Sequence, residues 1–489
     1  MLNQLHIIIK AKLMKLKKGD KLQVTIQNLA FGGAGVAHHQ TDQGNFVIFV
    51  DGVAPGEKVE IVINHIKKRL AKGYVTKYIE YSKLRIKPKC PHFGSDINDQ
   101  GEIIDAFDKS RNCGGCSWQF LSYSDQIKIK EKIVKESLNR IGGISENDLE
   151  LIMRPIVGME TPWFYRNKME FSFEYDKSGI LNLGLHLKGR HHDVSKIEQC
   201  FLFNDWIGDF LVKCRDFFPN IKFDGTWKTL TVREGQNTGE ILINLAVENG
   251  NIDFEEELID FILKSMKGKN LKSLYLTQIH NKKGTRKKIE EKILWGKAEF
   301  QEKLFLEDGR SFIFNVTSQA FLQPNTKQSG KLYSLINQIA DLKGDEKIFD
   351  LYCGTGTIGL TLAESAAKVI GIELNESAIE SAKKNAILNS VDNISFICGN
   401  VTEVLNENVG EADLVVVDPP RAGLNEKVIK TIIESNSPKL IYVSCNPTTL
   451  ARDIKLLTEG GFKLEIVRPI DQFCQTYHIE TVSLLKKID

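Results

Sequence analysis

Long apolar runs are missing from this 489-residue sequence. No stretch of about 18 uncharged apolar residues occurs, so we expect no membrane-spanning helix and no membrane partner. The N-terminal stretch MLNQLHIIIKAKLMKLKK interrupts its apolar residues with lysines and has no small-residue cleavage site after it, which argues against a signal peptide. We therefore expect a cytoplasmic protein. In that reducing compartment the nine cysteines are better suited to be ligands, a nucleophile or core residues than to form disulfides.

An excess of charge of one sign is also missing, because the formal net charge is only +2. Overall basicity therefore gives no sign of a nucleic-acid partner. Basic residues are clustered locally, and such clusters either follow a phosphate backbone or form a solvated surface. The clusters are Lys10, Lys12, Lys15, Lys17, Lys18 and Lys21, then Lys67, Lys68, Arg69 and Lys72, and then NKKGTRKK at 281–288.

The chain has no internal repeat or low-complexity segment, and it is longer than one hydrophobic core usually supports. Residues 18–79 alternate apolar and polar residues between glycine turns, which predicts a small β-barrel. An amphipathic helix is expected from about Ser124 to Arg140. Residues 152–309 mix strand and helix patterns, which predicts an α+β region. From about Phe312, strands and helices alternate, which predicts a doubly wound α/β domain with ligands at the carboxyl ends of its strands.

A glycine loop follows the first strand of this α/β domain. The stretch DLYCGTGTIG holds Gly354 and Gly356, and Glu373 closes the next strand. Glycines let the backbone approach a cofactor, and a carboxylate at the next strand end can hold two ribose hydroxyls. This spacing suits a dinucleotide and S-adenosylmethionine equally well. A flavodoxin-like sheet without a nucleotide also remains open.

Two later motifs narrow the choice of cofactor. CGN stands at 398–400 and DPP at 418–420, and this succession resembles class I methyltransferases. In that family the adenine lies near the residue after CG, here Asn400, and the ribose lies on the acid equivalent to Glu373. The resemblance implies S-adenosylmethionine as cofactor.

The stretch IYVSCNPTTLARD places Cys445 between an apolar run and a helix start. Arg421 replaces the aromatic residue that enzymes methylating amino groups carry after DPP, which disfavours an exocyclic nitrogen as target. Methylation at C5 of a pyrimidine instead needs a thiolate that adds to C6 and a general base that removes the C5 proton. His478 and Glu480 in YHIETV are candidates for that base. A buried, purely structural cysteine is the alternative.

The motifs SCNPTTLARD and HIETV, with FLQPN, DLYCGTG and DPPRAGL before them, resemble the RNA uracil-C5 methyltransferases. The resemblance covers almost the whole chain. It implies that Cys445 is the nucleophile and Glu480 the base, and it leaves His478 as a structural neighbour. It also implies an opened-out uridine as substrate. The residues on the family's cofactor-binding positions are Gln323, Tyr352, Glu373 and Asp418, with Gly354, Gly356, Asn400 and Thr357. Asp418 fits a contact with the uracil equally well.

Four further cysteines resemble the iron–sulfur site of this family. Cys113 and Cys116 form a Cys-x-x-Cys pair, with Cys90 before it and Cys200 after it. Thiolates at such spacing bind either a 4Fe-4S cluster or zinc. The sequence departs from the family pattern because an insertion, 95–112, separates Cys90 from the pair. Longer loops cost little extra closure entropy, so the insertion can bulge out without moving the ligands.

The predicted fold is α/β, with a C-terminal doubly wound class I methyltransferase sheet, an N-terminal OB-like barrel of the TRAM type and a central α+β domain. The predicted domains are residues 15–80 for the barrel, 81–116 with 151–310 for the centre, and 117–150 with 311–489 for catalysis. Helix 124–140 should accordingly pack on the catalytic sheet. We expect a monomer.

The predicted reaction is methylation of uridine C5 in 23S ribosomal RNA, because the bacterial tRNA enzymes are shorter and lack both the barrel and the cluster. Three alternatives remain: a tRNA T-loop uracil-C5 methyltransferase, a cytosine-C5 RNA methyltransferase and an inactive iron–sulfur RNA-binding protein. Cytosine-C5 enzymes usually carry a second cysteine after the DPP-type motif, and Arg421 stands there instead.

Overall fold

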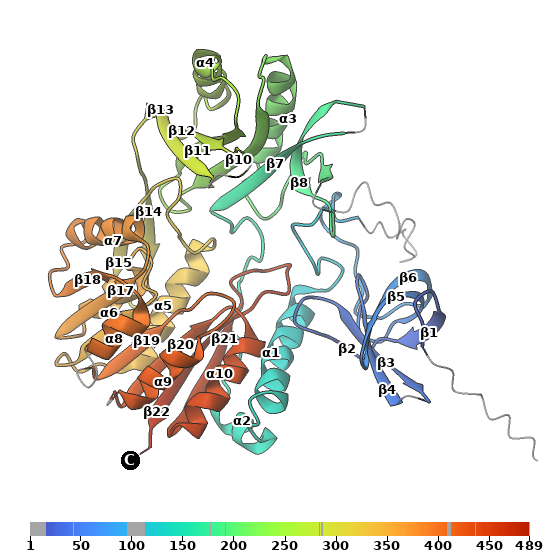
Figure 1. Cartoon of the computed structure of the whole chain (residues 1–489), viewed down its shortest axis with the longest axis vertical. Coiled ribbons are helices and arrows are strands. Elements are labelled where there is room, and N and C mark those ends of the chain that lie inside the picture. Colours follow the sequence, from blue (N-terminus) through green and yellow to red (C-terminus); the bar gives the residue numbers. More distant parts are fainter. Residues whose placement is uncertain are drawn as a thin grey trace, which may run out of the picture.

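The computed structural model describes residues 16–42, 44–94, 113–176, 178–190, 192–282, 284, 287–407, 412–435 and 437–488. The insertion 95–112 therefore lies outside the described residues, as do the basic residues before Leu16 and part of the 281–288 cluster. Within the described ranges, no helix is long and apolar enough to cross a bilayer. Figure 1 shows three parts, each built on a sheet, around a central region of loops.

The N-terminal part is one antiparallel sheet, apart from the parallel pairing of β4 with β6. Alternate side chains of its strands face a common core, and Val59, Ile61 and Ile63 are at most 1% exposed. This alternation produces the expected barrel-like fold. In spatial order the strands are β1 (Lys21–Thr25), β5 (Lys58–Lys67), β6 (Leu70–Glu80), β4 (Gly44–Val50), β3 (Gly35–Thr41) and β2 (Asn28–Leu29).

The middle part is a mixed seven-stranded sheet whose core is apolar and rich in aromatic residues. Its helices are α3 (Ile207–Phe217), η1 (Phe218–Asn220) and α4 (Glu255–Ser265). This is the α+β fold that the mixed patterns predicted. In spatial order its strands are β13 (Lys288–Gly296), β12 (Asn270–His280), β11 (Glu240–Glu248), β10 (Thr226–Glu234), β7 (Lys168–Tyr175), β8 (Leu181–His186) and β9 (Val194–Ser195).

The C-terminal part is a second seven-stranded sheet. Its first five strands in sequence are parallel, and the last two are antiparallel additions at one edge. A separate hairpin of β14 (Phe300–Phe305) and β15 (Ser311–Val316) packs beside it. In spatial order the strands are β18 (Ile394–Cys398), β17 (Lys368–Glu373), β16 (Lys347–Leu351), β19 (Leu414–Val417), β20 (Lys439–Ser444), β22 (Glu480–Lys487) and β21 (Phe462–Ile470).

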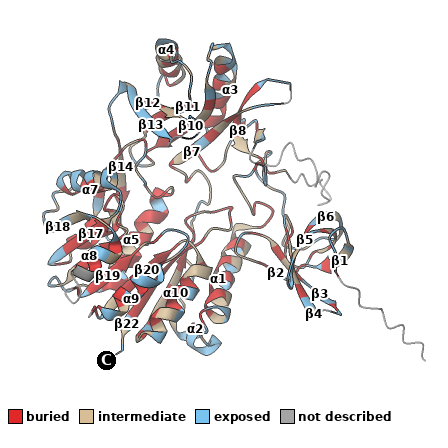
Figure 2. Ribbon diagram, viewed as in Figure 1, coloured by how far each residue is buried: buried red, intermediate tan, exposed pale blue. Residues whose placement is uncertain are grey.

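Helices cover both faces of this sheet, so its strands are apolar on both sides. In β20, for example, Leu440 and Tyr442 face one core while Ile441 and Val443 face the other. Figure 2 shows the buried strands between helices whose outer sides are exposed. One face carries α5 (Thr326–Ala340), α6 (Thr357–Ala363) and α7 (Glu376–Leu388), and the other carries α1 (Tyr123–Arg140), α2 (Glu146–Ile152), α8 (Val401–Glu407), α9 (Glu426–Glu434) and α10 (Pro447–Glu459).

Helix α1 packs on the C-terminal sheet, against α10 and β21, as the sequence predicted. Ile133, Val134 and Leu138 supply its apolar face. On the same side, the Lys130 ammonium forms a fully buried ion pair with Asp471, with an Nζ–Oδ1 distance of 2.6 Å. The N-terminal half of the chain therefore contributes a helix, and a buried charge, to the C-terminal part.

Replacing Lys130 by Met should lower the free energy of unfolding by about 3–5 kcal/mol, because it leaves the Asp471 carboxylate buried without its counter-ion. Urea unfolding of the whole chain measures the change. The matched control is Lys135→Met on the same helix, whose ion pair with Glu150 is exposed and is worth about 0–1 kcal/mol. Equal effects of the two substitutions would contradict the role given to the buried pair.

Candidate active site

The strand register brings four candidate residues to one edge of the C-terminal sheet. Leu351 of β16 is opposite Val417 of β19, which is opposite Tyr442 of β20, and Ser444 at the end of β20 is opposite Thr481 of β22. The carboxyl ends of parallel strands meet at the same edge, and antiparallel β22 begins there. The residues at these strand ends are Tyr352, Asp418, Cys445 and Glu480.

The position of Cys445 follows from its neighbours in the chain. Strand β20 ends at Ser444, and Asn446 caps α10 by accepting a hydrogen bond from the Thr448 N–H at 3.0 Å. Cys445 is the residue between the strand and this cap, and it is half-buried. The Asn446 amide also donates to the Arg421 carbonyl at 3.1 Å. This hydrogen bond connects the SCNP motif with the DPPR motif.

Burial and charge together define the chemistry of this edge. Burial, and then the charge of Asp418, raise the pKa of Glu480 well above its usual value. Burial raises the pKa of Asp418 to about 7. Burial, and then the charges of both acids, raise the pKa of Cys445 to about 11, while Arg421 lowers it. The site thus holds a thiol, two acids whose pKa values burial raises, and one cation that lowers the pKa values of Cys445 and Glu480.

The glycine loop lies at the same edge. Tyr352, Gly354 and Gly356 all have positive φ, at 62°, 54° and 83°, a conformation that costs glycine little. Glu373 at the end of β17 accepts hydrogen bonds from the Gly354 N–H at 3.3 Å and the Asn375 N–H at 2.9 Å. Its carboxylate is therefore held beside the loop and is only partly buried. These features fit the ribose of a nucleoside cofactor.

The remaining candidate residues around this loop differ in how far they are exposed to solvent. The Gln323 backbone carbonyl accepts the Asn167 amide at 2.8 Å, and Gln323 itself is buried. Asn400 is exposed and accepts the Thr402 N–H. The Thr357 hydroxyl accepts the Tyr333 O–H at 3.2 Å.

His478 is half-buried beside the predicted base. Its backbone N–H donates a hydrogen bond to the Thr476 hydroxyl at 3.2 Å. Burial, and then the charges of Arg421, Lys130 and Arg166, lower the pKa of its ring to about 4. A ring with so low a pKa is a weak base, which fits a neighbour of Glu480 better than a proton acceptor.

Three residues at this site were not assigned a role from the sequence. Arg421 was noted only for the aromatic residue or cysteine that it replaces, yet its charge acts on Cys445, Glu480 and His478. Asp350 is wholly buried, and its Oδ2 accepts the Gly359 N–H at 2.8 Å. Phe321 is 65% exposed on the segment that carries Gln323. The letters FLQPN and DPPR contained two of these residues but gave no sign of their exposure or charge effects.

The four cysteines of the expected cluster line one cavity of about 440 Å³. Each of their sulfurs accepts a hydrogen bond, namely from His92 N–H to Cys90, Gly115 N–H to Cys113, the Gln119 side chain to Cys116, and Leu202 and Phe203 N–H to Cys200. Burial raises the pKa of all four thiols, whereas these hydrogen bonds favour their thiolates. Among the described residues, no three His, Cys, Asp or Glu side chains meet closely enough to hold one metal ion.

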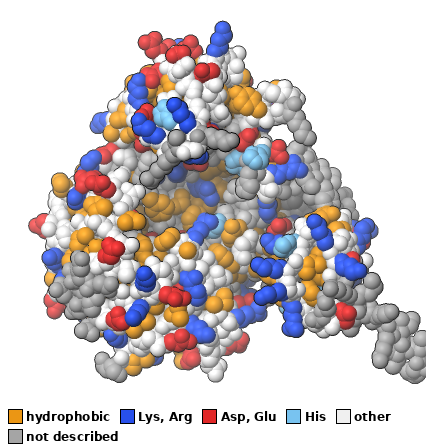
Figure 3. All heavy atoms as spheres, in the orientation of Figure 1, with side chains coloured by type: hydrophobic (Ala, Val, Ile, Leu, Met, Phe, Trp, Pro, Cys, Tyr) orange, Lys and Arg blue, Asp and Glu red, His pale blue; other side chains and the backbone are white. Residues whose placement is uncertain are grey.

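The molecule is hollowed where its three parts meet. Figure 3 shows this depression, with lysine and arginine side chains gathered on the barrel beside it. Trp118 joins the parts there, since its indole N–H donates to the Gly33 carbonyl of the barrel at 3.3 Å. A macromolecular substrate can therefore touch more than one part at once.

Comparison with known proteins identifies the family. Residues 263–488 match the family described as tRNA (Uracil-5-)-methyltransferase, and residues 15–76 match the TRAM domain. An uncharacterized RNA methyltransferase of Clostridium tetani is 34% identical over 97% of this chain and 100% of its own length. Another, from Protochlamydia amoebophila, is 36% identical over 88% of this chain and 98% of its own length.

A solved structure is similar over nearly the full length. The Pyrococcus abyssi tRNA (uracil-54, C5)-methyltransferase, in complex with S-adenosyl-L-homocysteine, has a TM-score of 0.68 and 26% identity, covering 95% of this chain and 100% of that one. The observed barrel, the sheet with its glycine loop and the full-length relatives all indicate the same family. The chain therefore belongs to the RNA methyltransferases of the tRNA (uracil-5-)-methyltransferase family and carries an N-terminal TRAM domain.

Proposed function

We propose that this protein methylates C5 of a uridine in RNA, using S-adenosylmethionine, through a covalent adduct on Cys445. The observation that carries the proposal is the meeting of one thiol, two acids and one arginine beside the glycine loop. Membership of the RNA methyltransferase family supports it. An inactive RNA-binding protein would have no need of this constellation.

The Cys445 thiol must first lose its proton. In the RNA-free site the raised pKa makes the thiolate a minor species, and the charge of Arg421 favours it. The thiolate then adds to C6 of the uracil, and the π electrons of the C5–C6 bond move into the C4 carbonyl to form an enolate. C5, which is a poor nucleophile in free uracil, becomes nucleophilic in this enolate.

When bound, S-adenosylmethionine would supply an electrophilic methyl group. C5 bonds to that carbon as the sulfur–methyl bond breaks, which leaves S-adenosylhomocysteine. The Glu480 carboxylate then removes the C5 proton, and the electron pair of the broken C–H bond re-forms the C5–C6 double bond while the Cys445 thiolate leaves. A carboxyl with a raised pKa is a stronger base once ionised, which suits removal of a carbon-bound proton. The net change replaces one C5–H bond by a C5–methyl bond and releases one proton.

Residues around the glycine loop would hold the cofactor. We assign the ribose to Glu373 and the adenine region to Asn400, with Gly354, Gly356 and Tyr352 forming the close backbone approach. Gln323 lies on the neighbouring segment, and Asp418 between this loop and Cys445 can contact either the cofactor or the uracil. The partly buried, loop-anchored carboxylate of Glu373 is the feature that supports this arrangement.

The RNA itself would contact the TRAM barrel, which we take as residues 15–80. The turn between β5 and β6 and the adjoining ends of these strands carry Lys67, Lys68, Arg69 and Lys72, all exposed and beside the apolar side chains of Val47 and Phe49. Cations beside an aromatic ring suit a phosphate backbone with accessible bases. Exposed Phe321 offers a second stacking surface, near the cofactor loop.

For the target we propose 23S ribosomal RNA, because the pairing of a TRAM barrel with four cysteines resembles the ribosomal type. The Pyrococcus abyssi enzyme favours a second candidate, tRNA, because that tRNA methyltransferase is similar over nearly the whole chain. Chain length therefore does not separate the two targets, and the substrate must be tested directly.

Incubation with S-adenosylmethionine and 5-fluorouridine-substituted ribosomal RNA should give a gel-stable protein–RNA adduct. Fluorine cannot leave C5 as a cation, so the enzyme should stay attached after methyl transfer. The adduct should disappear in Cys445→Ala and persist in Cys214→Ala, a matched change in the core of the middle part. An adduct that forms with tRNA but not with ribosomal RNA would identify tRNA as the substrate. The absence of an adduct with either RNA would contradict the mechanism.

The substitution Glu480→Gln should lower turnover by about 10²- to 10⁴-fold. Addition and methyl transfer need no base at C5, so this variant should accumulate a methylated, gel-stable adduct with ordinary uridine RNA. Glu465→Gln, at an exposed ion pair of β21, is the control and should behave like the parent. A slow variant that accumulates no adduct would assign the base to another residue.

We further propose that Cys90, Cys113, Cys116 and Cys200 hold a 4Fe-4S cluster. Four N–H-bonded sulfurs around one cavity suit thiolate ligands, and a cavity suits a cluster better than the single point that zinc requires. Nothing in the methyl transfer needs an electron, so the group would have a structural role or orient the RNA.

Protein purified without oxygen should contain iron and acid-labile sulfide, and Cys200→Ser should lose both. Cys398→Ser, an exposed cysteine outside the cavity, should retain them. Elemental analysis and the visible absorption spectrum measure the difference. Zinc without sulfide would identify the alternative metal, and retention of iron in Cys200→Ser would exclude that cysteine as a ligand.

A further inference from the structure

The loop between β21 and β22 connects the sheet edge to the proposed base. Ile470, the last residue of β21, pairs with Glu480, the first residue of β22, so the connecting segment 471–479 fixes where Glu480 begins. We call residues 471–478 the β21–β22 loop.

Five consecutive backbone carbonyls of the loop, 471–475, each accept a hydrogen bond from another segment. From the side of α5 and its cap, Gln328 donates to the Asp471 carbonyl at 3.1 Å and Asn325 to the Gln472 carbonyl at 3.0 Å. The other three donations are Lys130 to Phe473 at 3.1 Å, Tyr165 to Cys474 at 2.9 Å, and the Ser117 and Trp118 N–H groups to Gln475 at 2.9 and 3.1 Å.

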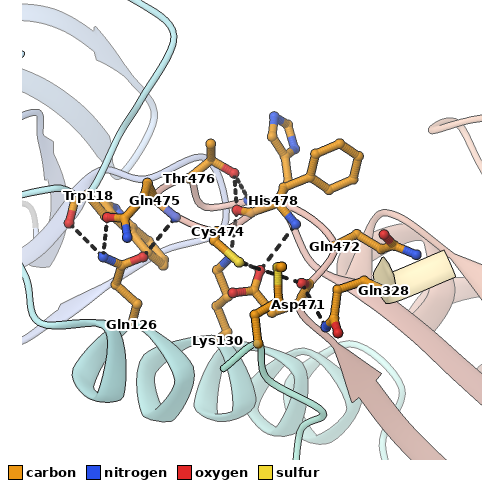
Figure 4. A network of polar contacts seen from close by, with 12 residues as sticks. Trp118, Gln126, Lys130, Gln328, Asp471, Gln472, Cys474, Gln475, Thr476 and His478 are labelled. Atoms are coloured by element: carbon orange, nitrogen blue, oxygen red, sulfur yellow. Dashed lines mark hydrogen bonds and ion pairs between the residues drawn. The ribbon is translucent and has the colours of Figure 1, made fainter. Parts of the chain in front are cut away.

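Helix α1 forms hydrogen bonds with this loop at two points, as Figure 4 shows. Lys130 binds its start, and Gln126, one turn earlier, binds Gln475 twice. The Gln126 Oε1 accepts the Gln475 N–H at 3.0 Å, and its Nε2 donates to the Gln475 Oε1 at 2.9 Å. The Gln126 side chain is fully buried, and its Nε2 is also directed at the Trp118 and Leu121 carbonyls.

Gln475 needs this support because of its backbone. Its φ is +67°, which is unusual for a residue with a side chain and costs of order 1–3 kcal/mol. From Gln475 the chain passes through Thr476, whose hydroxyl donates to the Phe473 carbonyl at 2.8 Å and accepts the His478 N–H at 3.2 Å. Two residues after His478 the chain reaches Glu480. The strained Gln475 and its supports therefore lie in the segment that leads directly to the proposed base.

We propose that Gln126 is a positioning residue for Glu480. By holding Gln475 in its left-handed conformation, Gln126 sets the path of the chain into β22 and the place of the Glu480 carboxylate. Gln126 comes from helix α1, about 350 residues earlier in the sequence, and touches none of the reacting groups. This inference rests on the proposed function of Glu480.

The substitution Gln126→Met keeps the side-chain length and removes all of its hydrogen bonds. Misplacing a catalytic group by about 1 Å can cost a factor of about 100, so we expect turnover to fall about 10- to 100-fold with KM for S-adenosylmethionine unchanged. The specific sign is accumulation of a methylated, gel-stable adduct with ordinary uridine RNA, as expected for Glu480→Gln. Lys128→Met, exposed on the same helix, is the control and should show neither effect.

The outcomes separate the two claims. Slow turnover of Gln126→Met without the adduct, or parental kinetics, overturns the positioning role while Glu480→Gln still accumulates adduct. If Glu480→Gln accumulates none, the proposed function fails and the inference fails with it. Should Gln126→Met not fold, as judged by circular dichroism, Tyr165→Phe removes a single hydrogen bond that is donated to the same loop, at the Cys474 carbonyl. That variant should accumulate adduct to a smaller extent, and a lack of adduct overturns the proposal.

Discussion

The arrangement of this protein depends on one constraint: the buried carbonyls of the β21–β22 loop must be hydrogen-bonded. An unpaired buried carbonyl costs about as much free energy as a lost hydrogen bond, and five in succession need partners at residues 471–475. Those partners come from the segment after the cysteine pair, from α1, from the loop before β7 and from the start of α5. Satisfying this loop therefore ties distant parts of the chain to the base.

The barrel is tied to the same place by apolar contact. Phe31 meets Tyr477 edge-to-face, with ring centroids 5.8 Å apart, and Trp118 reaches the Gly33 carbonyl. A side chain at Gly33 would meet the Tyr477 ring, and its φ of +88° also favours glycine. The part of the molecule expected to hold RNA thus touches the residue that precedes His478. The proposed RNA-binding part and the proposed catalytic residues are therefore neighbours.

Burial at the active edge has two opposing consequences. It raises the pKa of Cys445, which lowers the thiolate fraction, and it raises the pKa of Glu480, which in the proposed mechanism makes the ionised carboxylate a stronger base for the C5 proton. Arg421 lowers both pKa values and so moderates the first effect. The arginine that stands where amino-methylating enzymes have an aromatic residue thereby has a clear electrostatic function in this site.

The sequence by itself predicted the order of the three parts along the chain, the glycine loop, helix α1 and the strand ends that meet beside that loop. These features are local. Alternation of apolar and polar residues with a period of two predicts strands, and Gly354 and Gly356 mark a tight loop. The carboxyl ends of the strands in a parallel sheet share one edge. The family findings then decided between S-adenosylmethionine and a dinucleotide, which the loop spacing alone left open.

Only the tertiary structure decided which distant residues meet. Gln126 and Gln475, and Lys130 and Asp471, are far apart in the chain, and no periodicity relates them. The pKa shifts likewise depend on burial and on charges from other segments, which a linear pattern does not contain. Short-range propensity fixes the elements, whereas positions across the molecule follow from packing and from the need to pair buried polar groups.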